Sequence, residues 1–479
     1  MIPLDAYGPR RLEALVQPLL HDQAPVAPSC ERVLQWVWAH QRLQRDALRT
    51  FDDRPLTVLH PGFWNREPGP DFRRAVLQFG AQPAVTGDVE IDLLPGGWHQ
   101  HRHHLNPEYT GVRLRVVWTP PSLPDPGLPT LVMADFLDSP LPELIASYGH
   151  QTDPAFSPVP AGACADFLRH LAPEALREWL VQAARVRLAL KARHLTARAR
   201  QAGWAQALWE GLFTALGYKH NPWPMRRLAE LIPALPGATP GNRRTPQSLQ
   251  AAFLGLAGLL PRDLAHDRRT SDRYVRELWD LWWREQSHLA DRVLPRHLWR
   301  LHGLRPANHP ARRLALAAHW LSEPRWTDRL ESWLAQDAPP SRWPVSLLDG
   351  LNASDPFWSR HWTLASPELP TPHPLLGLPR ATDLAMNVIL PWFWSRAQAV
   401  ANSAAMARIE ARYLAWPSGE DNAVLRLARQ RLLEGRPFPH PRAASLQQGL
   451  LQVVHDYCDR ADARCAGCPL PDLLGTPGG

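Results

Sequence analysis

The sequence predicts an α+β protein in which a mixed α/β domain is followed by a large all-α region. Strand-like segments, separated by Gly and Pro, fill roughly residues 1–145. From about residue 165 onward, apolar residues recur instead at helical spacing. With 479 residues the chain is long enough for several domains and for a large core without disulfides. We therefore expect segments at 1–145 (mixed α/β), 165–440 (helical) and 441–479 (a helix followed by a Cys-rich knuckle).

The first segment begins with one helix and continues with strands. Val33, Trp36, Val37 and Ala47 share one face of a helix predicted over 31–48. The strands are short apolar or alternating runs that end at turns such as Pro95-Gly96-Gly97. They are expected at 56–59, 75–79, 85–93, 112–118 and 130–136.

The second part reads as helices joined by segments rich in Pro and Gly. Its 173–202 stretch is the longest, with apolar residues every three or four positions. No strict repeat period is present, which argues against a regular solenoid. The expected helices are 173–202, 204–217, 223–234, 246–260, 272–296, 310–336, 382–414, 422–434 and 443–457.

Charge and cysteine usage limit the partners and the compartment. The chain has 53 basic and 46 acidic residues, a net charge of +7, and lysine only at positions 191 and 219. This balance permits nucleic acid as a partner, although the two signs are interspersed. No signal peptide is evident at the N-terminus, and the longest apolar run, 251–260, is too short for a membrane span. Five cysteines, an odd number, suit a reducing cytoplasm. The oligomeric state is not indicated.

Carboxylates alternate along the strand expected at 85–93. Apolar residues take one face, and the other face presents Asp88, Glu90 and Asp92. A hairpin that pairs Phe79 with Ala84 places Asp71 opposite Asp92, so that four carboxylates meet on one face. Like charges this close repel unless they are solvated or a divalent cation neutralises them. The segment thus predicts either a cation site or the polar outer face of an amphipathic strand.

Four histidines follow this strand within six residues, at 99, 101, 103 and 104. Imidazoles so placed can ligate a metal or act as acid and base, and His101 and His103 are the candidates. The alternative is an exposed loop that contacts only solvent or phosphate.

At these residues the chain resembles the bacterial family called domain of unknown function 2851, a name that implies no activity. The family pattern has His at the positions of Asp92 and Arg115, and Asp at that of Asn106. The matching stretches are GPDF at 69–72, GDVEI at 87–91, the WxxHxH motif at 98–103, the strand at 109–118, LFxALGY at 212–218, RPxNxP at 305–310, NVILP at 387–391 and the C-terminal cysteines.

The N-terminal segment also resembles, more weakly, the PD-(D/E)xK core of restriction-endonuclease-like enzymes. This resemblance implies that Asp71 and Glu90, 19 residues apart, hold Mg²⁺ or Mn²⁺. Glu31 matches the helix carboxylate that some members use. The position of the usual Lys is Asp92, and no Lys lies in the segment. His101 or His103 then replaces the Lys, or Asp92 itself ligates the metal; without a substitute the site is inactive.

Three cysteines near the C-terminus form another candidate metal site. The spacing of Cys458, Cys465 and Cys468 resembles the first three positions of the iron–sulfur loop in endonuclease III-like glycosylases. No fourth Cys follows, so His455 is the candidate fourth ligand for Zn²⁺ or an iron–sulfur cluster. The alternative is three reduced thiols. Cys30 and Cys164 are expected to be small buried apolar residues.

Together these features predict a metal-dependent nuclease-like protein that acts on the phosphodiesters of nucleic acid. Asp71, Glu90 and Asp92 are the expected metal ligands, and His101 or His103 the base or a further ligand. One alternative is a non-catalytic nucleic-acid-binding or scaffold protein with a degenerate nuclease fold. The other is a metal-dependent hydrolase of another substrate. Arginines along 173–202 could follow phosphates, but a solvated helix face explains them better.

Overall fold

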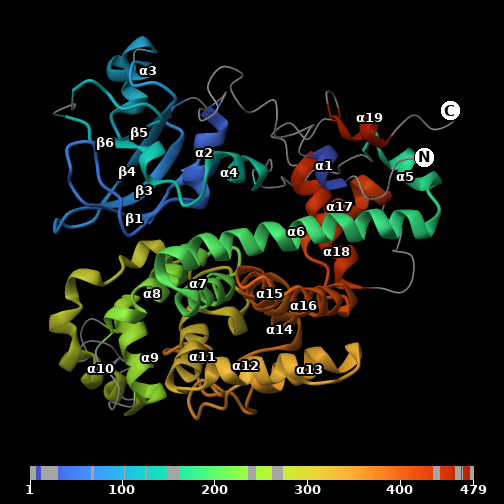
Figure 1. Ribbon diagram of the computed structural model, residues 1–479. Coiled ribbons are helices and arrows are strands. Elements are labelled where there is room, and N and C mark those ends of the chain that lie inside the picture. The colour runs from blue at the N-terminus through green and yellow to red at the C-terminus, as the bar shows by residue number, and fades with distance from the viewer. Residues whose placement is uncertain are drawn as a thin grey trace. The chain divides into compact units, whose positions relative to one another are not determined.

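The computed structural model divides the chain into two compact units. Unit 1 comprises Met1–Gln201 and Ala397–Gly479, and unit 2 comprises Ala202–Arg396. A sheet near the N-terminus is followed by a chain that is almost entirely helical, which confirms the α+β class (Figure 1). The boundaries expected at 145, 165 and 440 stay a prediction. The structure describes residues 7–11, 28, 31–65, 69–101, 103–123, 127–147, 162–235, 244–261, 273–434, 443–458, 465 and 468–474.

Unit 1 contains one mixed, six-stranded sheet in the order β1-β3-β4-β5-β6, with β2 paired to β3. The pairs β1/β3, β2/β3 and β3/β4 are antiparallel, whereas β4/β5 and β5/β6 are parallel. All five expected strands are present, but the last ends early and continues as a 3₁₀ turn, Met133–Phe136. The strands are β1 (Leu56–His60), β2 (Phe63–Trp64), β3 (Phe72–Phe79), β4 (Val85–Asp92), β5 (Val112–Val117) and β6 (Thr130–Val132).

One helix, α2 (Glu31–His40), packs against the apolar face of this sheet. Its side chains Leu34, Val37 and Trp38 are buried with those of the strands. The predicted extension of this helix to residue 48 is wrong. Gln41 adopts a left-handed conformation (φ 48°), which ends the helix, and Leu43 then pairs with Leu137 as an isolated bridge.

A β-bulge in β3 changes the register expected for the hairpin. Leu77 pairs with Val85, but beyond the bulge Phe72 pairs with Val89, which places Asp71 beside Glu90. The predicted pairing of Asp71 with Asp92 is therefore wrong by two residues. The bulge forms around Arg74, whose φ is 59°. Because a shift of two residues preserves the face of the sheet, Asp71 still lies on the side of Glu90 and Asp92.

The parallel pair β4/β5 requires a crossover, and this crossover carries the histidines. It contains α3 (Gly97–Gln100) and two 3₁₀ turns, His103–Leu105 and Pro107–Tyr109. Parallel neighbours cannot be joined by a tight hairpin, so the connection must pass over the end of β4. The chain consequently returns past Asp92, the last residue of β4.

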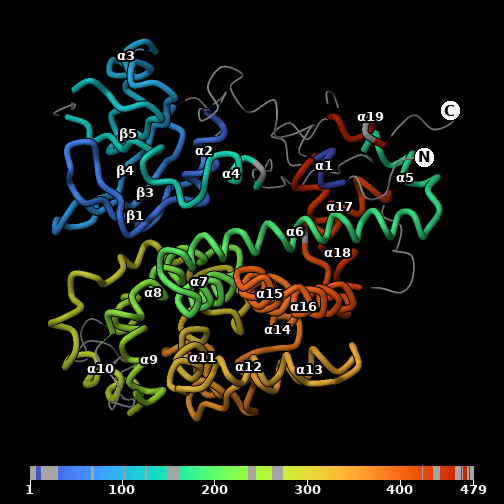
Figure 2. The backbone as a smooth tube through the Cα atoms, in the orientation of Figure 1, coloured from blue at the N-terminus to red at the C-terminus, as the bar shows by residue number. Residues whose placement is uncertain are grey.

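Most of the remaining helices of unit 1 pack around a second apolar core, whereas the helix at Leu141–Ser147 adds Leu144 to the core of the sheet. The longest, α6 (Pro173–Ala202), has the predicted bounds and runs as one continuous helix (Figure 2). Asp456, near the C-terminus, contacts two residues near the N-terminus. It forms an ion pair with Arg11 (2.7 Å) and accepts a hydrogen bond from the Tyr7 hydroxyl (2.9 Å). The others are α1 (Tyr7–Arg11), α4 (Leu141–Ser147), α5 (Ala165–His170), α16 (Ser403–Ala415), α17 (Ala423–Leu433), α18 (Ala444–Val453), a π-helical turn (Val454–Cys458) and α19 (Leu470–Leu474).

Unit 2 is helical. Several of its helices begin with Pro in the first turn, where the missing N–H costs nothing, and this explains part of the high Pro count. The stretches expected as single helices at 272–296 and 310–336 are each shorter or broken. No helix in the described residues is long and apolar enough to cross a membrane. The helices are α7 (Trp204–Leu216), α8 (Pro222–Glu230), α9 (Pro246–Leu256), α10 (Arg273–Glu285), α11 (Pro310–Ser322), α12 (Trp326–Ala335), α13 (Trp343–Leu351), α14 (Leu378–Leu384), a π-helical turn (Ala385–Ile389) and α15 (Leu390–Ala399).

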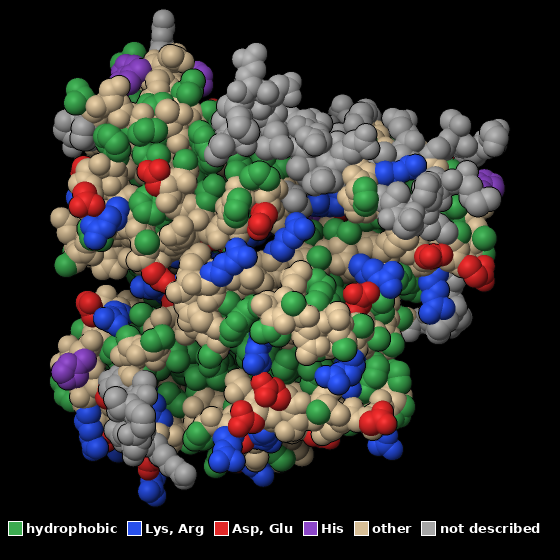
Figure 3. All heavy atoms as spheres, in the orientation of Figure 1, with side chains coloured by type: hydrophobic (Ala, Val, Ile, Leu, Met, Phe, Trp, Pro, Cys, Tyr) green, Lys and Arg blue, Asp and Glu red, His purple; other side chains and the backbone are tan. Residues whose placement is uncertain are grey.

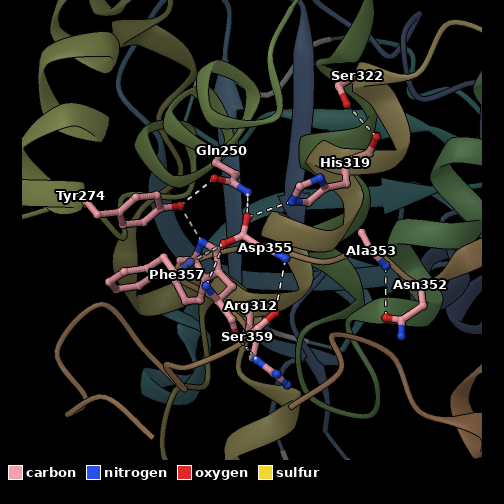
Figure 4. Close-up of polar contacts among 11 residues, drawn as sticks. Gln250, Tyr274, Arg312, His319, Ser322, Asn352, Ala353, Asp355, Phe357 and Ser359 are labelled. Atoms are coloured by element: carbon pink, nitrogen blue, oxygen red, sulfur yellow. Dashed lines mark hydrogen bonds and ion pairs between the residues drawn. The ribbon is translucent and has the colours of Figure 1, made fainter. Parts of the chain in front are cut away.

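A buried polar network centred on Asp355 joins three of these helices (Figure 4). Its carboxylate accepts hydrogen bonds from Gln250 (2.7 Å), from His319 (2.8 Å) and from two backbone N–H groups of the following turn. Tyr274 donates to Gln250 and accepts from the Trp358 indole. Every Asp355 oxygen has a partner, so the network fixes α9, α10 and α11 to the loop after α13.

Replacing Asp355 by alanine is expected to destabilise unit 2 by about 3–5 kcal/mol, because it leaves several buried donors without an acceptor. Burial raises the pKa of Asp355, but hydrogen bonds from His319, Trp358 and Gln250 outweigh it and leave the pKa below its ordinary value. The ionised carboxylate therefore stabilises the fold above that ordinary value, and this contribution is lost as the pH falls through the lowered pKa. Urea unfolding measures the change. The exposed Asp349→Ala is the control and should shift stability by less than about 0.5 kcal/mol.

Candidate functional site

Three carboxylates meet where β3 begins and β4 ends. Glu90 and Asp92 lie on the same face of β4 and are 6% and 2% exposed. The backbone N–H of Asp71 donates to Glu90 Oε2 (3.1 Å), and the N–H of Ile91 donates to Asp71 Oδ2 (3.0 Å). Gln35 of α2 donates to the other oxygen of Asp71 (2.7 Å). Asp71 and Glu90 are thus held in place by the bulged hairpin and the helix behind it.

The crossover brings two histidines to Asp92. One ligand atom from each of Asp92, His101 and His103 lies within 4.8 Å of the others. His103 Nε2 is also 3.3 Å from Glu90 Oε1, so this imidazole joins the two halves of the site. Of the three residues, Asp92 is buried, His103 is half-buried and His101 is exposed. The group therefore opens to solvent on the side of His101.

One oxygen of this group has no hydrogen-bond partner. Asp92 Oδ2 is buried without a donor, and its nearest cationic atom, Arg115 Nε, lies 3.9 Å away. The Arg115 guanidinium donates instead to the carbonyl of Pro95. A buried, unsatisfied carboxylate oxygen costs free energy unless a ligand completes it. Its position beside two imidazoles fits a cation at this point.

A glycine gives the Asp92 carboxylate the space it occupies. A Cβ atom at Gly97, in the first turn of α3, would lie 2.3 Å from Asp92 Oδ1. Gly97→Ala is therefore expected to displace the carboxylate and to weaken Mn²⁺ binding at least tenfold, an order-of-magnitude estimate. Isothermal titration measures this change. Gly96→Ala is the matched control, since its Cβ would meet only the end of the Gln100 side chain, at 3.1 Å.

Burial and the charges of neighbouring carboxylates raise the pKa of all three carboxyl groups. Burial, followed by the charges of Glu31 and Asp92, raises the pKa of Asp71 to about 7 against the lowering effect of the Ile91 amide. Burial and the charge of Asp71 raise the pKa of Glu90 to about 9. Burial raises the pKa of Asp92 to about 6, although Arg115 opposes the shift. Carboxylates gathered against their own repulsion need a counter-charge when they ionise.

Aromatic rings position His103. Tyr109 stacks on its imidazole with ring centroids 4.0 Å apart and planes at 30°, and Trp98 packs at 5.6 Å. Burial, and after it the charges of His101 and Arg115, lower the pKa of His103. A lowered pKa favours the neutral imidazole, which is the form that ligates metals.

The donor set determines which cations suit the site. Two imidazole nitrogens and one carboxylate oxygen favour Mn²⁺, Fe²⁺ or Zn²⁺ over Mg²⁺, which prefers oxygen ligands alone. The residues present fit a divalent cation held by Asp92, His101 and His103, with Glu90 beside it. The Asp71 carboxylate instead accepts from Gln35 and Ile91.

The five residues that the sequence selected at this end of the sheet lie together in the structure, but Asp88, the fourth carboxylate that alternation predicts, does not join them. Asp88 accepts from the backbone N–H of Arg74 (2.9 Å) at the bulge, so the prediction of four converging carboxylates is wrong for this residue. Glu31, at the first position of α2, does belong to the group, since its charge acts on Asp71, Glu90 and Asp92.

Three contributors were not selected from the sequence as site residues: Gln35, Tyr109 and Arg115, the last of which was named only as a position where the family pattern has His. Gln35 is a polar residue among the buried positions of α2, and this break in the apolar pattern is its only signal. Arg115 could have been suspected as a charge within the apolar strand β5, opposite Glu90. Tyr109 carried no signal of its own, because its role depends on a stacking contact.

At the C-terminal end, Cys458, Cys465 and Cys468 are partly buried against the second core of unit 1 or near it. His455, proposed from the sequence as their fourth partner, instead has its Nδ1 3.4 Å from Asp456 Oδ1. Whether these cysteines bind a metal stays a prediction.

Arginines of α6 contact neighbouring side chains, which argues against a phosphate-binding track along this helix. Arg185 pairs with Glu410 (2.7 Å), Arg198 pairs with Asp46 (2.8 Å), and Arg187 donates to Gln448. On the face seen in Figure 3, basic and acidic side chains alternate and form no large patch of one sign.

Comparison with known proteins gives one match. The family described as "Protein of unknown function (DUF2851)" matches residues 31–422, which include the whole sheet and most of the helices. No curated protein and no solved structure matches the chain.

Proposed function

The chain belongs to the DUF2851 family, and we propose that it is a divalent-metal-dependent hydrolase that cleaves phosphodiester bonds in nucleic acid. The observation that carries the proposal is the Asp92–His101–His103 group with its unsatisfied carboxylate oxygen. Two further buried carboxylates, Asp71 and Glu90, lie next to it.

The residues divide the work by their contacts. Asp92, His101 and His103 hold the cation, which when bound supplies a Lewis acid for a phosphoryl oxygen. Glu90 is the candidate general base once cation binding has released its proton, because its Oε1 lies beside His103 while its Oε2 is fixed by the Asp71 amide. Asp71 and Tyr109 are positioning residues that hold Glu90 and His103. Substrate approaches from the side of His101, which is exposed.

The order of elements supports a nuclease-like reaction. A helix is followed by antiparallel strands, an acid precedes one strand and a second acid lies in its partner, and a crossover leads to a parallel strand. This is the arrangement that the resemblance to the PD-(D/E)xK core implies. The usual Lys is absent, and the two histidines of the crossover take over part of its role by binding the cation.

Charge supports nucleic acid as the substrate. The net charge is +7. Two exposed arginines lie close in sequence to site residues: Arg74 is at the bulge of β3, three residues after Asp71, and Arg113 is in β5, two residues before Arg115. Neither makes an ion pair with a described acidic residue, so both remain able to contact phosphates next to the site.

The test uses the purified full chain with Mn²⁺, Zn²⁺ or Mg²⁺ and with single-stranded DNA, duplex DNA or RNA. We expect cleavage with Mn²⁺ that EDTA abolishes and that Glu90→Gln reduces by about 10²–10⁴-fold. Asp135→Asn, an exposed residue outside the site, is the control and should cleave like the wild type.

Three outcomes overturn the proposal. Binding of nucleic acid without cleavage under any metal identifies a non-catalytic binding protein. Cleavage of a small phosphodiester such as bis-p-nitrophenyl phosphate, but of no nucleic acid, identifies a hydrolase of another substrate. If the protein neither binds nor cleaves any of these substrates, the buried carboxylates have a structural role only.

A further inference from the structure

A fourth cysteine lies with the three near the C-terminus. Cys164 stands directly before α5, some 300 residues earlier in the chain, and is buried in the second core of unit 1. Cys458 closes the π-helical turn after α18. Cys465 and Cys468 follow in the last described segment. None of these four cysteines forms a disulfide, and they come from three separate parts of the chain.

Direct contacts bring these segments together. The backbone N–H of Ala163 donates to Cys465 Sγ (3.3 Å). A Cβ atom placed on Gly162 would lie 3.5 Å from Cys164 Sγ and 3.8 Å from Cys465 Sγ, so both sulfurs lie beside the same glycine. The N–H of Cys468 donates to the carbonyl of Cys465 (3.1 Å), which closes the turn between this pair.

The remaining sulfurs belong to the same group. Cys458 and Cys468 pack against the apolar core that contains Cys164. The Cys468 thiol donates to the carbonyl of Tyr457, the residue before Cys458 (3.7 Å). The Arg431 guanidinium donates to Cys465 Sγ (3.7 Å), and an N–H···S bond of this kind stabilises a thiolate.

We propose that Cys164, Cys458, Cys465 and Cys468 hold a [4Fe–4S] cluster. Four cysteines are the ligand set of such a cluster, and the apolar surroundings and N–H···S bonds are the protein features that tune one. The cluster is separate from the proposed catalytic site and links the C-terminal segment to α5 and α18. His455 is not among its ligands, because its ring contacts Asp456.

The spacing of the sulfurs favours a cluster over a zinc ion. Zn²⁺ with bonds of about 2.3 Å in a tetrahedron requires sulfurs roughly 3.8 Å apart. Among the described residues, the only group of three or more ligand atoms close enough to hold one ion is Asp92, His101 and His103, so the four sulfurs do not form such a group. In a [4Fe–4S] cluster each thiolate binds its own iron, and the four sulfurs are therefore farther apart.

The experiment measures iron, zinc, acid-labile sulfide and visible absorption of the full chain after anaerobic purification and after reconstitution with iron and sulfide. We expect about four iron and four sulfide per chain. Cys164→Ser should lose at least half of the iron and shift the spectrum. His455→Ala, at the residue that the proposal excludes, and Cys30→Ser, at the cysteine outside the described residues, should retain both.

Several results overturn the proposal. These are wild-type protein with zinc and no sulfide, wild-type protein without either metal after reconstitution, and Cys164→Ser with full iron and an unchanged spectrum. Circular dichroism checks the fold of the serine variant. If it does not fold, Cys468→Ser provides the same test at a partly buried position, with His455→Ala as the reference. None of these measurements depends on nuclease activity, so this inference and the proposed function can fail independently.

Discussion

Asp92→Asn is expected to reduce Mn²⁺-dependent cleavage of nucleic acid by about 10²–10³-fold and to weaken Mn²⁺ binding in parallel. The substitution keeps the size of the side chain but removes the negative charge of the carboxylate. The Oδ2 atom of this carboxylate lies buried without a donor. Binding of Mn²⁺ is followed by isothermal titration, and cleavage by gel electrophoresis of labelled DNA. Mn²⁺ affinity and the rate of cleavage should fall together, because the ion that is bound is the one that cleavage requires.

Two variants of Tyr109 separate metal binding from a general loss of structure. Tyr109→Phe keeps the ring that stacks on His103 at 4.0 Å and should bind Mn²⁺ like the wild type. Tyr109→Ala removes the stack and should weaken Mn²⁺ binding by about 10–100-fold, as for other residues that orient a ligand. Asp92→Asn with wild-type affinity for Mn²⁺ would contradict the assignment of this residue.

The apo protein is expected to lose about 2 kcal/mol of stability or more between pH 6.5 and 8.5. In the folded protein the pKa of Glu90 is about 9 and that of Asp71 about 7, whereas both groups are ionised in the unfolded chain throughout this range. The native state therefore binds more protons than the unfolded state, and the free energy of unfolding falls as the pH rises. The stabilising contribution of each proton is complete below the unfolded pKa and is lost through the folded one.

Unfolding by urea in EDTA at several pH values measures this slope. Glu90→Gln is the reference, because glutamine retains an acceptor for the Asp71 amide but does not titrate, and its slope should be clearly smaller. Mn²⁺ should stabilise the wild type more at pH 8.5 than at pH 6.5, since binding releases these protons. A wild-type slope equal to that of Glu90→Gln would show that Glu90 is already ionised at neutral pH.

Much of unit 1 could be predicted from the sequence because strands and helices leave periodic patterns. The five strands, and α6 with its exact bounds, follow from alternation and from apolar spacing. The end of α2 could not be predicted, because the apolar residues after Gln41 continue to be buried but in an irregular segment. An apolar pattern shows which residues are buried. It does not show where a helix ends when the residues that follow the helix are buried as well.

The candidate site illustrates the same division. Alternation placed Glu90 and Asp92 on one face, and a register shift of two residues, one of them at the bulge, left Asp71 on that face. The bulge itself depends on the left-handed conformation of Arg74, for which the sequence has no Gly or Asn as a signal. Alternation places Asp88 on the same face, but its carboxylate accepts a hydrogen bond from the backbone N–H of Arg74 at that bulge.

The sequence by itself determined the fold class and the acidic and histidine side chains that form the candidate site, because these follow from local patterns. Only the tertiary structure decided which of them meet. The crossover required by a parallel strand pair carries His101 and His103 back to Asp92. Packing of one helical core likewise brings Cys164 to cysteines 300 residues away. Contacts between distant segments depend on how the chain closes its cores, and no local pattern records that.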